Sequence, residues 1–310
     1  MTTADSAVVV GHLTVDDIVL PTGETAMETP GGDALYASLA MRLWGVTPQL
    51  VTARPREYPP RILEAINHLG VDTQFLQPVE VPGVRQWALY DGKGGRQYHP
   101  QAGSSNYEEI SPRPDRAIQL PGNVVAAHVA PMPAIYQHQW VQWLKGQGCQ
   151  WICLDPHENQ LSDWDLWRQI LAVVTVFLPS EVEVEVLLGP RVPALEAAKE
   201  LSRMGPRMVV VKRGEHGSLW YDRETQTAGA VSAVSADAVD PTGCGDAYCG
   251  GFLAGLVRTG RPELAVQWGA VSASYVLEGY GPSRILQARP AEAAERLSWF
   301  RSNQCGEETE

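Results

Sequence analysis

Cysteine is scarce in this sequence, and no long hydrophobic run occurs. The five cysteines among 310 residues show no disulfide or zinc spacing and no CxxC pair, so we expect reduced thiols that are mostly buried. No apolar run approaches the ~18 residues that a membrane helix needs. Asp5 stands where a secretion signal would be basic. We therefore expect a soluble, cytoplasmic protein.

Basic residues are also in deficit. The chain has 24 Lys and Arg against 36 Asp and Glu, which gives a formal net charge of −12 at pH 7. Such an acidic chain repels phosphate backbones and anionic lipid, so we expect neither nucleic acid nor a membrane surface as a partner. A small anionic ligand is still compatible, because a helix N-terminus with a nearby Lys or Arg overrides the overall field locally.

Two common phosphate-binding signatures are absent. The sequence has no GxxxxGK[ST] segment, which excludes a P-loop protein. No GxGxxG follows the first predicted strand, which leaves a dinucleotide-binding fold without support. Any phosphate site in this chain must therefore be built in another way.

Short apolar segments alternate with amphipathic ones along most of the chain. Strands are predicted at 7–13, 49–53, 123–130, 151–155, 173–178 and 207–212, and helices at 33–44, 61–70, 134–145, 164–171 and 193–204. Nearly all-apolar strands separated by helices indicate a parallel sheet that is covered on both faces. The sequence therefore predicts an α/β fold.

Two segments in the first third of the chain do not fit this alternation. Residues 84–99 alternate polar and apolar side chains around a DGKGG turn, which predicts an antiparallel hairpin. Residues 15–28 look like a second, smaller hairpin. The two can pair into a small sheet outside the main layers, which is either a lid over a site or a surface decoration.

The segment with the clearest chemistry is VDPTGCGDAYCGGFLAGL at 239–256. Ala247 to Leu256 is a predicted helix, and 240–246 is the turn that leads into it. The glycines of this turn leave backbone N–H groups uncovered at the positive end of the helix, which favours an anion. Asp246 lies beside that anion, where it can accept the proton of an attacking hydroxyl. An ordinary first-turn acid is the alternative interpretation.

DPTGCGD followed by AYCGGF resembles the C-terminal signature of the PfkB (ribokinase-like) family of carbohydrate and nucleoside kinases. Four further segments resemble family motifs in the family's order: GHLTVD (11–16), PGGDALYA (30–37), LPSEVE (178–183) and VVVKRGEHGSLWY (209–221). The resemblance implies a three-layer α/β/α fold with a mainly parallel central sheet, in a single domain over 1–310. It also implies a small β-sheet lid made of about 15–29 and 83–100.

The resemblance further implies roles for individual residues. Asp246 matches the catalytic base, and the anion hole matches Gly243, Cys244 and Gly245. Acceptor-binding positions match Asp16, Gly31, Gly32 and Asp33. ATP-contact positions match Ser180, Lys212, Arg213, Gly214 and Thr242. Metal-linked positions match Glu183, for Mg²⁺ held through water, and Asp240, for a monovalent cation such as K⁺.

The sequence departs from the family pattern at several of these positions. Tyr36 and Ser180 stand where the family usually has Asn. Ser180 and Glu183 also form an S-x-x-E capping box, so a metal-linked role and a purely structural cap both stay open for Glu183. We expect Arg85 and Arg96 of the longer hairpin to be solvated, which favours a neutral polyhydroxylated acceptor over a sugar acid.

Three functions stay open at this point. The first is an ATP-dependent kinase that phosphorylates a hydroxyl of a small sugar or polyol. The second is a nucleoside kinase, in which Tyr36 could stack on a base. The third is a catalytically weak sugar- or nucleotide-sensing binding protein. We expect Mg²⁺ to arrive with ATP, while activation by K⁺ and a homodimer formed through the lid are left open.

Overall fold

The computed structural model describes residues 6–91, 95–116, 120 and 124–304. Asn123, Cys305 and the middle of the DGKGG turn, which enter the predictions above, lie outside the described residues. The described cysteines are all free, and Cys149, Cys153 and Cys249 are buried as expected. In this part of the chain, every helix is too short or too polar to cross a lipid bilayer.

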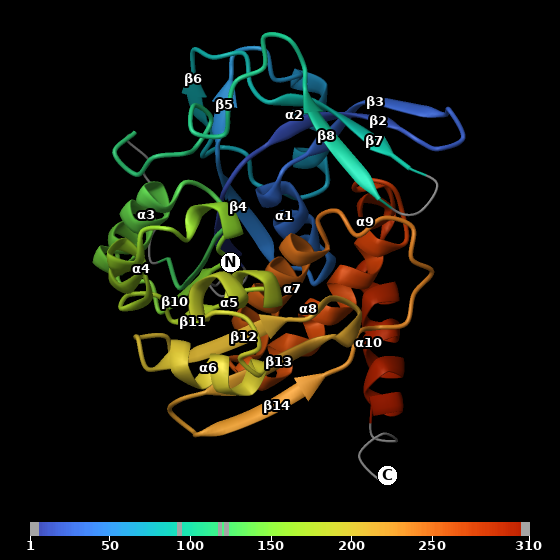
Figure 1. Cartoon of the computed structure of the whole chain (residues 1–310). Coiled ribbons are helices and arrows are strands. Elements are labelled where there is room, and N and C mark those ends of the chain that lie inside the picture. Colours follow the sequence, from blue (N-terminus) through green and yellow to red (C-terminus); the bar gives the residue numbers. More distant parts are fainter. Residues whose placement is uncertain (1–5, 92–94, 117–119, 121–123, 305–310) are drawn as a thin grey trace.

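An eight-stranded sheet forms the centre of the molecule (Figure 1). Its strand order is β14-β13-β12-β11-β10-β9-β1-β4, in which β12 through β4 are parallel and β13 and β14 are antiparallel. The strands are β1 (Ser6–Val10), β4 (Thr47–Val51), β9 (Ala126–Val129), β10 (Trp151–Leu154), β11 (Val176–Phe177), β12 (Met208–Lys212), β13 (Ser218–Asp222) and β14 (Thr227–Val231). Each of the six predicted strands overlaps one of them.

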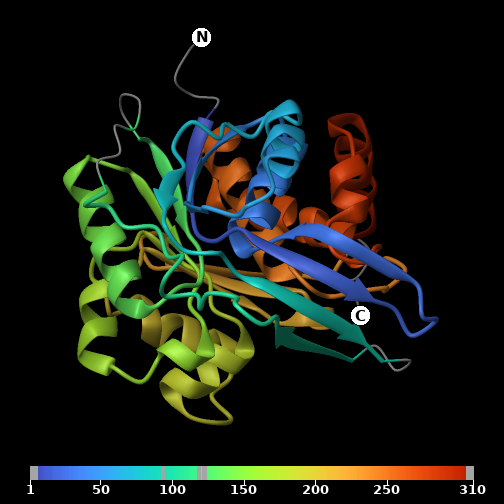
Figure 2. The same cartoon turned by 90° about the horizontal axis from the view of Figure 1, so that it is seen from above.

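Helices cover both faces of this sheet (Figure 2). One face carries α1 (Asp33–Leu43), α2 (Pro60–His68), α7 (Cys244–Thr259), α8 (Pro262–Leu277), α9 (Ser283–Gln287) and α10 (Pro290–Gln304). The other carries α3 (Ala134–Gly146), α4 (Trp164–Leu171), α5 (Glu181–Leu188) and α6 (Ala194–Ser202). Strand β1 serves both layers, because Val9 joins the first core while Val8 and Val10 join the second. The three-layer prediction is confirmed.

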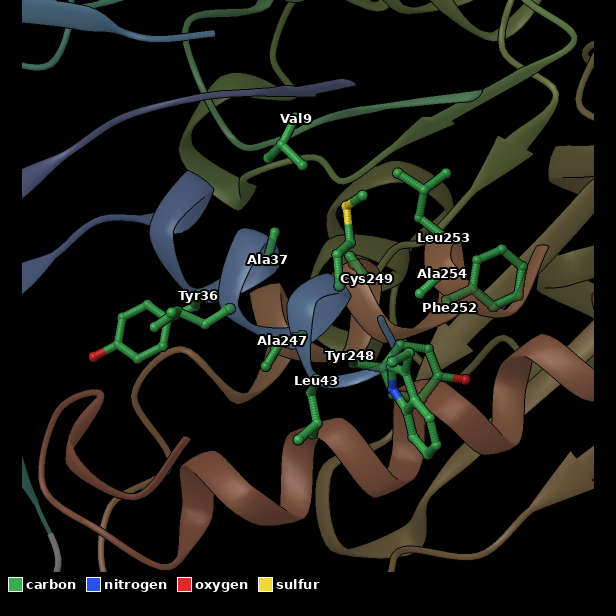
Figure 3. Packing of buried hydrophobic residues seen from close by; sticks show 14 of the residues in the cluster. Val9, Tyr36, Ala37, Leu43, Ala247, Tyr248, Cys249, Phe252, Leu253 and Ala254 are labelled. Carbon is green, nitrogen blue, oxygen red and sulfur yellow. The ribbon is translucent and has the colours of Figure 1, made fainter. Parts of the chain in front are cut away.

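Helix α7 packs unusually close to its neighbours, because glycines face them. A Cβ on Gly250 would overlap the carbonyl of Ala37 in α1, and a Cβ on Gly251 would overlap Ser272 in α8. Figure 3 shows α1 and α7 meeting in this core, with Ala37 and Cys249 between them. This tight packing fixes the N-terminus of α7, where the candidate anion site begins.

A second sheet has the order β3-β2-β7-β8 and lies apart from the main sheet (Figure 1). It consists of β2 (Thr14–Val19), β3 (Thr25–Gly31), β7 (Arg85–Tyr90) and β8 (Arg96–Pro100). Both predicted hairpins are present as antiparallel pairs, and a parallel pairing of β2 with β7 joins them. We call this four-stranded sheet the small sheet. A further pair, β5 (Ala53–Pro55) with β6 (Gln77–Val79), is parallel.

Candidate active site

The residues predicted for the site come from strand ends and helix starts that meet at one edge of the main sheet. Lys212 ends β12, Asp33 begins α1 and Asp246 lies in the first turn of α7. Their charges act on one another, since Asp33 raises and Lys212 lowers the pKa of Asp246. Segments separated by more than 200 residues in sequence therefore converge, as expected for the carboxyl edge of an α/β sheet.

Helix α7 begins three residues earlier than predicted, so the glycine turn is its first turn. Gly243 caps the helix with φ +77, a left-handed conformation that favours glycine. A Cβ at Gly243 would lie 2.6 Å from carbons of the Tyr36 ring, so this glycine also rests flat against that ring. The N–H groups of Gly245 and Asp246 lie in the first turn, where helices provide no internal acceptor. This turn can therefore bind an anion.

Cys244 does not fit the predicted anion hole as a donor. Its N–H donates to the Pro241 carbonyl at 3.2 Å, which closes the turn ahead of the helix. The turn geometry is the cause. A turn that places Gly243 in the left-handed region uses the Cys244 N–H for its own internal hydrogen bond. Gly245 and Asp246 remain as the first-turn donors.

Lys212 lies directly against this turn. Its Nζ donates to both carboxylate oxygens of Asp155, at 2.6 and 2.5 Å. A Cβ on Gly245 would lie 3.6 Å from the same Nζ, so the ammonium group faces the start of α7. Burial lowers the pKa of Lys212, but the Asp155 charge outweighs burial and holds that pKa above its usual value. The ammonium therefore stays charged beside the anion site.

Asp155 was not predicted as a site residue. It follows β10 directly, is buried, and accepts a hydrogen bond from the Cys249 thiol at 3.4 Å in addition to the Lys212 pair. The available signal was an acid immediately after the buried strand at 151–154. Its partner Lys212 ends a strand 57 residues later, so the pair is evident only in three dimensions.

Asp246 is half-buried in this charged environment. Removal of its carboxylate from water raises its pKa to about 8, and the charges of Asp33, Asp155 and Glu183 add to the rise while Lys212 opposes it. A carboxyl group with a pKa near neutrality is suited to accept a proton.

The acceptor side of the site contains Asp16 on β2, which is only 7% exposed. Its carboxylate accepts hydrogen bonds from Gln86 at 3.1 Å and from Thr14 at 3.2 Å. Burial raises the pKa of Asp16 to about 6 despite these bonds. A Cβ on Gly31 would overlap this carboxylate, and Gly32 has φ +104 against the His12 carbonyl. Gly31 therefore allows β3 to approach this strand, and Gly32 allows the start of α1 to approach the backbone at His12.

Asp33 is held in place by His12. The His12 N–H donates to Asp33 Oδ1 at 2.6 Å, and the His12 ring nitrogen Nδ1 lies 2.9 Å from Oδ2. The other ring nitrogen lies 2.9 Å from the Ser111 hydroxyl. His12 is thus a buried residue whose ring nitrogens both have partners, and it orients one of the predicted acceptor-binding carboxylates.

Two partly exposed tyrosines have hydroxyl groups whose pKa values respond to the Asp16 charge. Tyr98 of β8 is 37% exposed and Tyr107 is 45% exposed. Burial raises the pKa of both side chains, and the charge of Asp16 adds to each rise. Tyr36, by contrast, is 3% exposed and packed on Gly243. The expectation that Tyr36 stacks on a base is therefore wrong, because its ring is already covered.

The capping box at Ser180 and Glu183 is present. The Glu183 Oε2 accepts from the Ser180 N–H at 2.5 Å and from its hydroxyl at 2.6 Å, while the Glu183 N–H donates to Ser180 Oγ at 3.3 Å. The Ser180 hydroxyl is thus committed to the cap, which removes it from the predicted ATP contacts. The charge of Glu183 still acts on the site, since it raises the pKa of Asp246.

The other predicted ATP contacts are Arg213, Gly214 and Thr242, and they lie in two different loops. Arg213 pairs with Glu181 at 2.9 Å, and Gly214 follows it with φ +55 in an exposed turn, so both border the end of β12. Thr242 instead donates both its N–H and its hydroxyl to Asp240. Its hydroxyl is used inside its own loop and is therefore not free to contact ATP.

Arg85 and Arg96 keep part of the predicted exposure, 39% and 30% of their side chains, but each also pairs with a buried carboxylate. Arg85 makes a two-point contact with the buried Asp17, at 2.8 and 3.1 Å. Arg96 lies 3.5 Å from Oδ1 of Asp240. The pairing has a physical reason, because a buried carboxylate needs a positive partner.

Comparison with known proteins adds to this geometry. A family described as pfkB family carbohydrate kinase matches residues 4–289. A cytidine kinase from Thermococcus kodakarensis is 30% identical over 277 residues, covering 88% of this chain and 96% of that protein. A nucleoside kinase from Burkholderia thailandensis in complex with inosine has a TM-score of 0.76 at 19% identity, covering 96% of this chain and 99% of that one.

A candidate ribokinase II from E. coli in complex with ATP and Mg²⁺ has a TM-score of 0.77 at 18% identity, covering 95% of this chain and 99% of that one. These structural matches confirm the predicted ribokinase-like fold, with a large, mainly parallel sheet and a separate smaller sheet.

Proposed function

Because the chain belongs to the pfkB family of carbohydrate kinases, phosphotransferases that act on hydroxyl groups, we propose that it transfers the γ-phosphoryl group of ATP to a hydroxyl of a neutral polyhydroxylated acceptor. One observation carries the proposal. The Asp246 carboxylate lies in the first turn of α7, which faces the Lys212 ammonium, and the charges of Lys212 and Asp33 both act on it. We further propose that the small sheet is the lid of this site.

In the proposed reaction, Asp246 takes the proton of the acceptor hydroxyl, whose oxygen then attacks the γ-phosphorus. The bond from that phosphorus to the β–γ bridging oxygen breaks, and ADP leaves. The N–H groups of Gly245 and Asp246, together with the Lys212 ammonium, stabilise the charge that the transferring group carries. A carboxylate beside bound phosphate repels it and would weaken binding. Its presence therefore favours a catalytic base at Asp246 over a protein that only binds its ligand.

Mg²⁺ bound to ATP would neutralise the β- and γ-phosphates in this site. Among the described residues, no group of three or more His, Cys, Asp or Glu side chains is arranged to hold a metal ion. We therefore propose that the ion enters with the nucleotide and keeps most of its waters, with Glu183 as the acid that faces them.

A nucleoside is the acceptor that the pocket favours over a free sugar. Asp16 suits a ribose hydroxyl, because Gln86 and Thr14 both donate to its Oδ1 and leave Oδ2 to accept a hydrogen bond from the acceptor. Tyr98 and Tyr107 are partly exposed aromatic side chains on which a base can stack, and the Arg96 guanidinium already lies 5.4 Å from the Tyr98 ring centroid. The cytidine kinase and the nucleoside kinase among the similar proteins are consistent with this choice.

Replacement of Asp16 with Ala tests the acceptor side of the proposal. We expect kcat/KM for the acceptor to fall by at least about tenfold, which corresponds to about 1.4 kcal/mol for a lost charge-assisted hydrogen bond, with the KM for ATP little changed. Steady-state kinetics with each substrate varied in turn gives both numbers. A variant with weakened ATP binding and an unchanged acceptor KM would mean that the two halves of the site are reversed.

A further inference from the structure

Asp240 is a fully buried carboxylate in the loop that leads into α7, with 0% exposure. Its Oδ1 accepts the Thr242 N–H at 2.9 Å and the Thr242 hydroxyl at 2.5 Å. Its Oδ2 accepts the Gly281 N–H at 3.1 Å and the Tyr90 hydroxyl at 2.5 Å. Three separate segments of the chain therefore meet on one carboxylate.

Two of the groups on Asp240 come from the small sheet. Tyr90 and Arg96 are directly opposite each other in the β7–β8 pair. The Tyr90 hydroxyl donates to Asp240, and the Arg96 guanidinium lies 3.5 Å from its other oxygen. The Tyr90 ring also packs edge-on against Tyr280, with centroids 5.1 Å apart. Tyr90 and Arg96 thus attach one end of the β7–β8 hairpin to the loop before α7, and Tyr90 also attaches it to the turn after α8.

The attachment matters because a buried charge is unfavourable without a partner of opposite sign. Thr242 and Gly281 supply only neutral donors from the body of the protein, whereas Arg96 supplies a full positive charge from the small sheet. When the small sheet lifts away, Asp240 loses this charge and the Tyr90 hydrogen bond together. The position of the small sheet and the state of the loop at 240–242 are therefore coupled.

A monovalent cation does not fit at the Asp240 carboxylate. A carboxylate offers about four acceptor positions, and the four hydrogen bonds described above use them. The Arg96 guanidinium already provides the positive charge that such a cation would bring. The cation site implied by the resemblance is thus occupied by the protein's own side chains.

We propose that Tyr90 and Arg96 are positioning residues that fasten the small sheet to the loop before the anion site, and that Arg96 takes the place of a monovalent cation at Asp240. Asp240 is three residues from Gly243, so closure over the acceptor is transmitted directly to the first turn of α7. The structural part of this proposal stands on the contacts alone, and its kinetic part rests on the proposed kinase function.

The first test is hydrogen exchange of β7 and β8 in the free protein, compared among wild type, Tyr90→Phe and Arg96→Gln. We expect exchange about tenfold faster in both variants, the change that a lost hydrogen bond to a charged group gives. Arg56→Gln is the matched control, because Arg56 is 58% exposed and pairs only with its neighbour Glu57 across 3.2 Å. Wild-type exchange in Tyr90→Phe would overturn the attachment, and that variant decides the question even if Arg96→Gln does not fold.

The second test is turnover in KCl against tetramethylammonium chloride at equal ionic strength. We expect wild-type kcat to agree within about twofold between the two salts, and kcat of Tyr90→Phe and Arg96→Gln to fall about tenfold with little change in the KM for ATP. A partial recovery of kcat by Arg96→Gln in KCl would directly support the proposal that Arg96 takes the place of a monovalent cation. A wild-type enzyme activated more than about tenfold by K⁺ would overturn it. Absence of any turnover would count against the proposed function, while the exchange result would still decide the attachment.

Discussion

Asp246→Asn will lower turnover by about 10²–10⁴-fold, the usual contribution of a positioned general base, while folding and nucleotide binding stay nearly intact. Asn has the same shape and keeps the start of α7, but it cannot accept the proton of the acceptor hydroxyl. Thermal stability will not fall, because burial raises the pKa of Asp246 to about 8 and the folded state therefore disfavours its charged form at neutral pH. Kinetics and melting curves of the two proteins provide the comparison. A variant that keeps more than a tenth of the wild-type rate excludes Asp246 as the base.

The pH profile separates a general base from a structural acid at this position. The base works only when deprotonated, so kcat/KM of the wild type will rise with pH, about tenfold per unit, up to the pKa of Asp246 near 8 and then level off. The sign follows from burial, which favours the protonated form below that pH. A profile that is flat between about pH 6 and 9 contradicts the assignment.

Gly243→Ala will reduce kcat by about 10²-fold, the effect expected when a reacting group is displaced by about 1 Å. The residue has φ +77, and its added Cβ would lie 2.6 Å from the buried Tyr36 ring. Tyr36 cannot move aside, because it is packed in the core. The turn must shift instead, which carries the N–H groups of Gly245 and Asp246 away from the transferring phosphoryl group.

Gly260→Ala is the matched control for this variant. Gly260 ends the same helix with φ +63, and a Cβ there meets nothing within 4 Å. Both variants will lose stability by about 1–2 kcal/mol from the left-handed backbone, but Gly260→Ala will keep kcat within about twofold. Equal kcat values in the two variants would show that the contact of Gly243 with Tyr36 does not control the anion site.

The alternation of apolar strands and helices was enough to predict the main sheet, because each strand is short and buried on both faces. The helices after α7 were not predicted. Helix α8 has buried residues around most of its circumference, including Ala265, Gly269 and Tyr275, since it packs between α7 and α10. A helix without a polar face has no amphipathic stripe to recognise.

The candidate site was predictable only where its residues lie close together in sequence. The glycine turn and Asp246 form one segment, so their spacing carries the signal. The pairs Lys212 with Asp155 and Tyr90 with Asp240 join residues 57 and 150 positions apart, and no local pattern reports them. For the same reason the ion pairs of Arg85 and Arg96 with buried carboxylates were not predicted.

The most direct test of the proposed reaction is acceptor-dependent ADP formation by the wild-type protein with ATP and Mg²⁺. The panel contains nucleosides, free sugars, polyols and sugar acids, and the product is analysed for a phosphate ester on the acceptor. We predict ADP formation with neutral polyhydroxylated acceptors, greatest with nucleosides, and one phosphate ester for each ADP. The contradicting result is ATP binding without any panel member raising ADP formation above the rate measured with no acceptor.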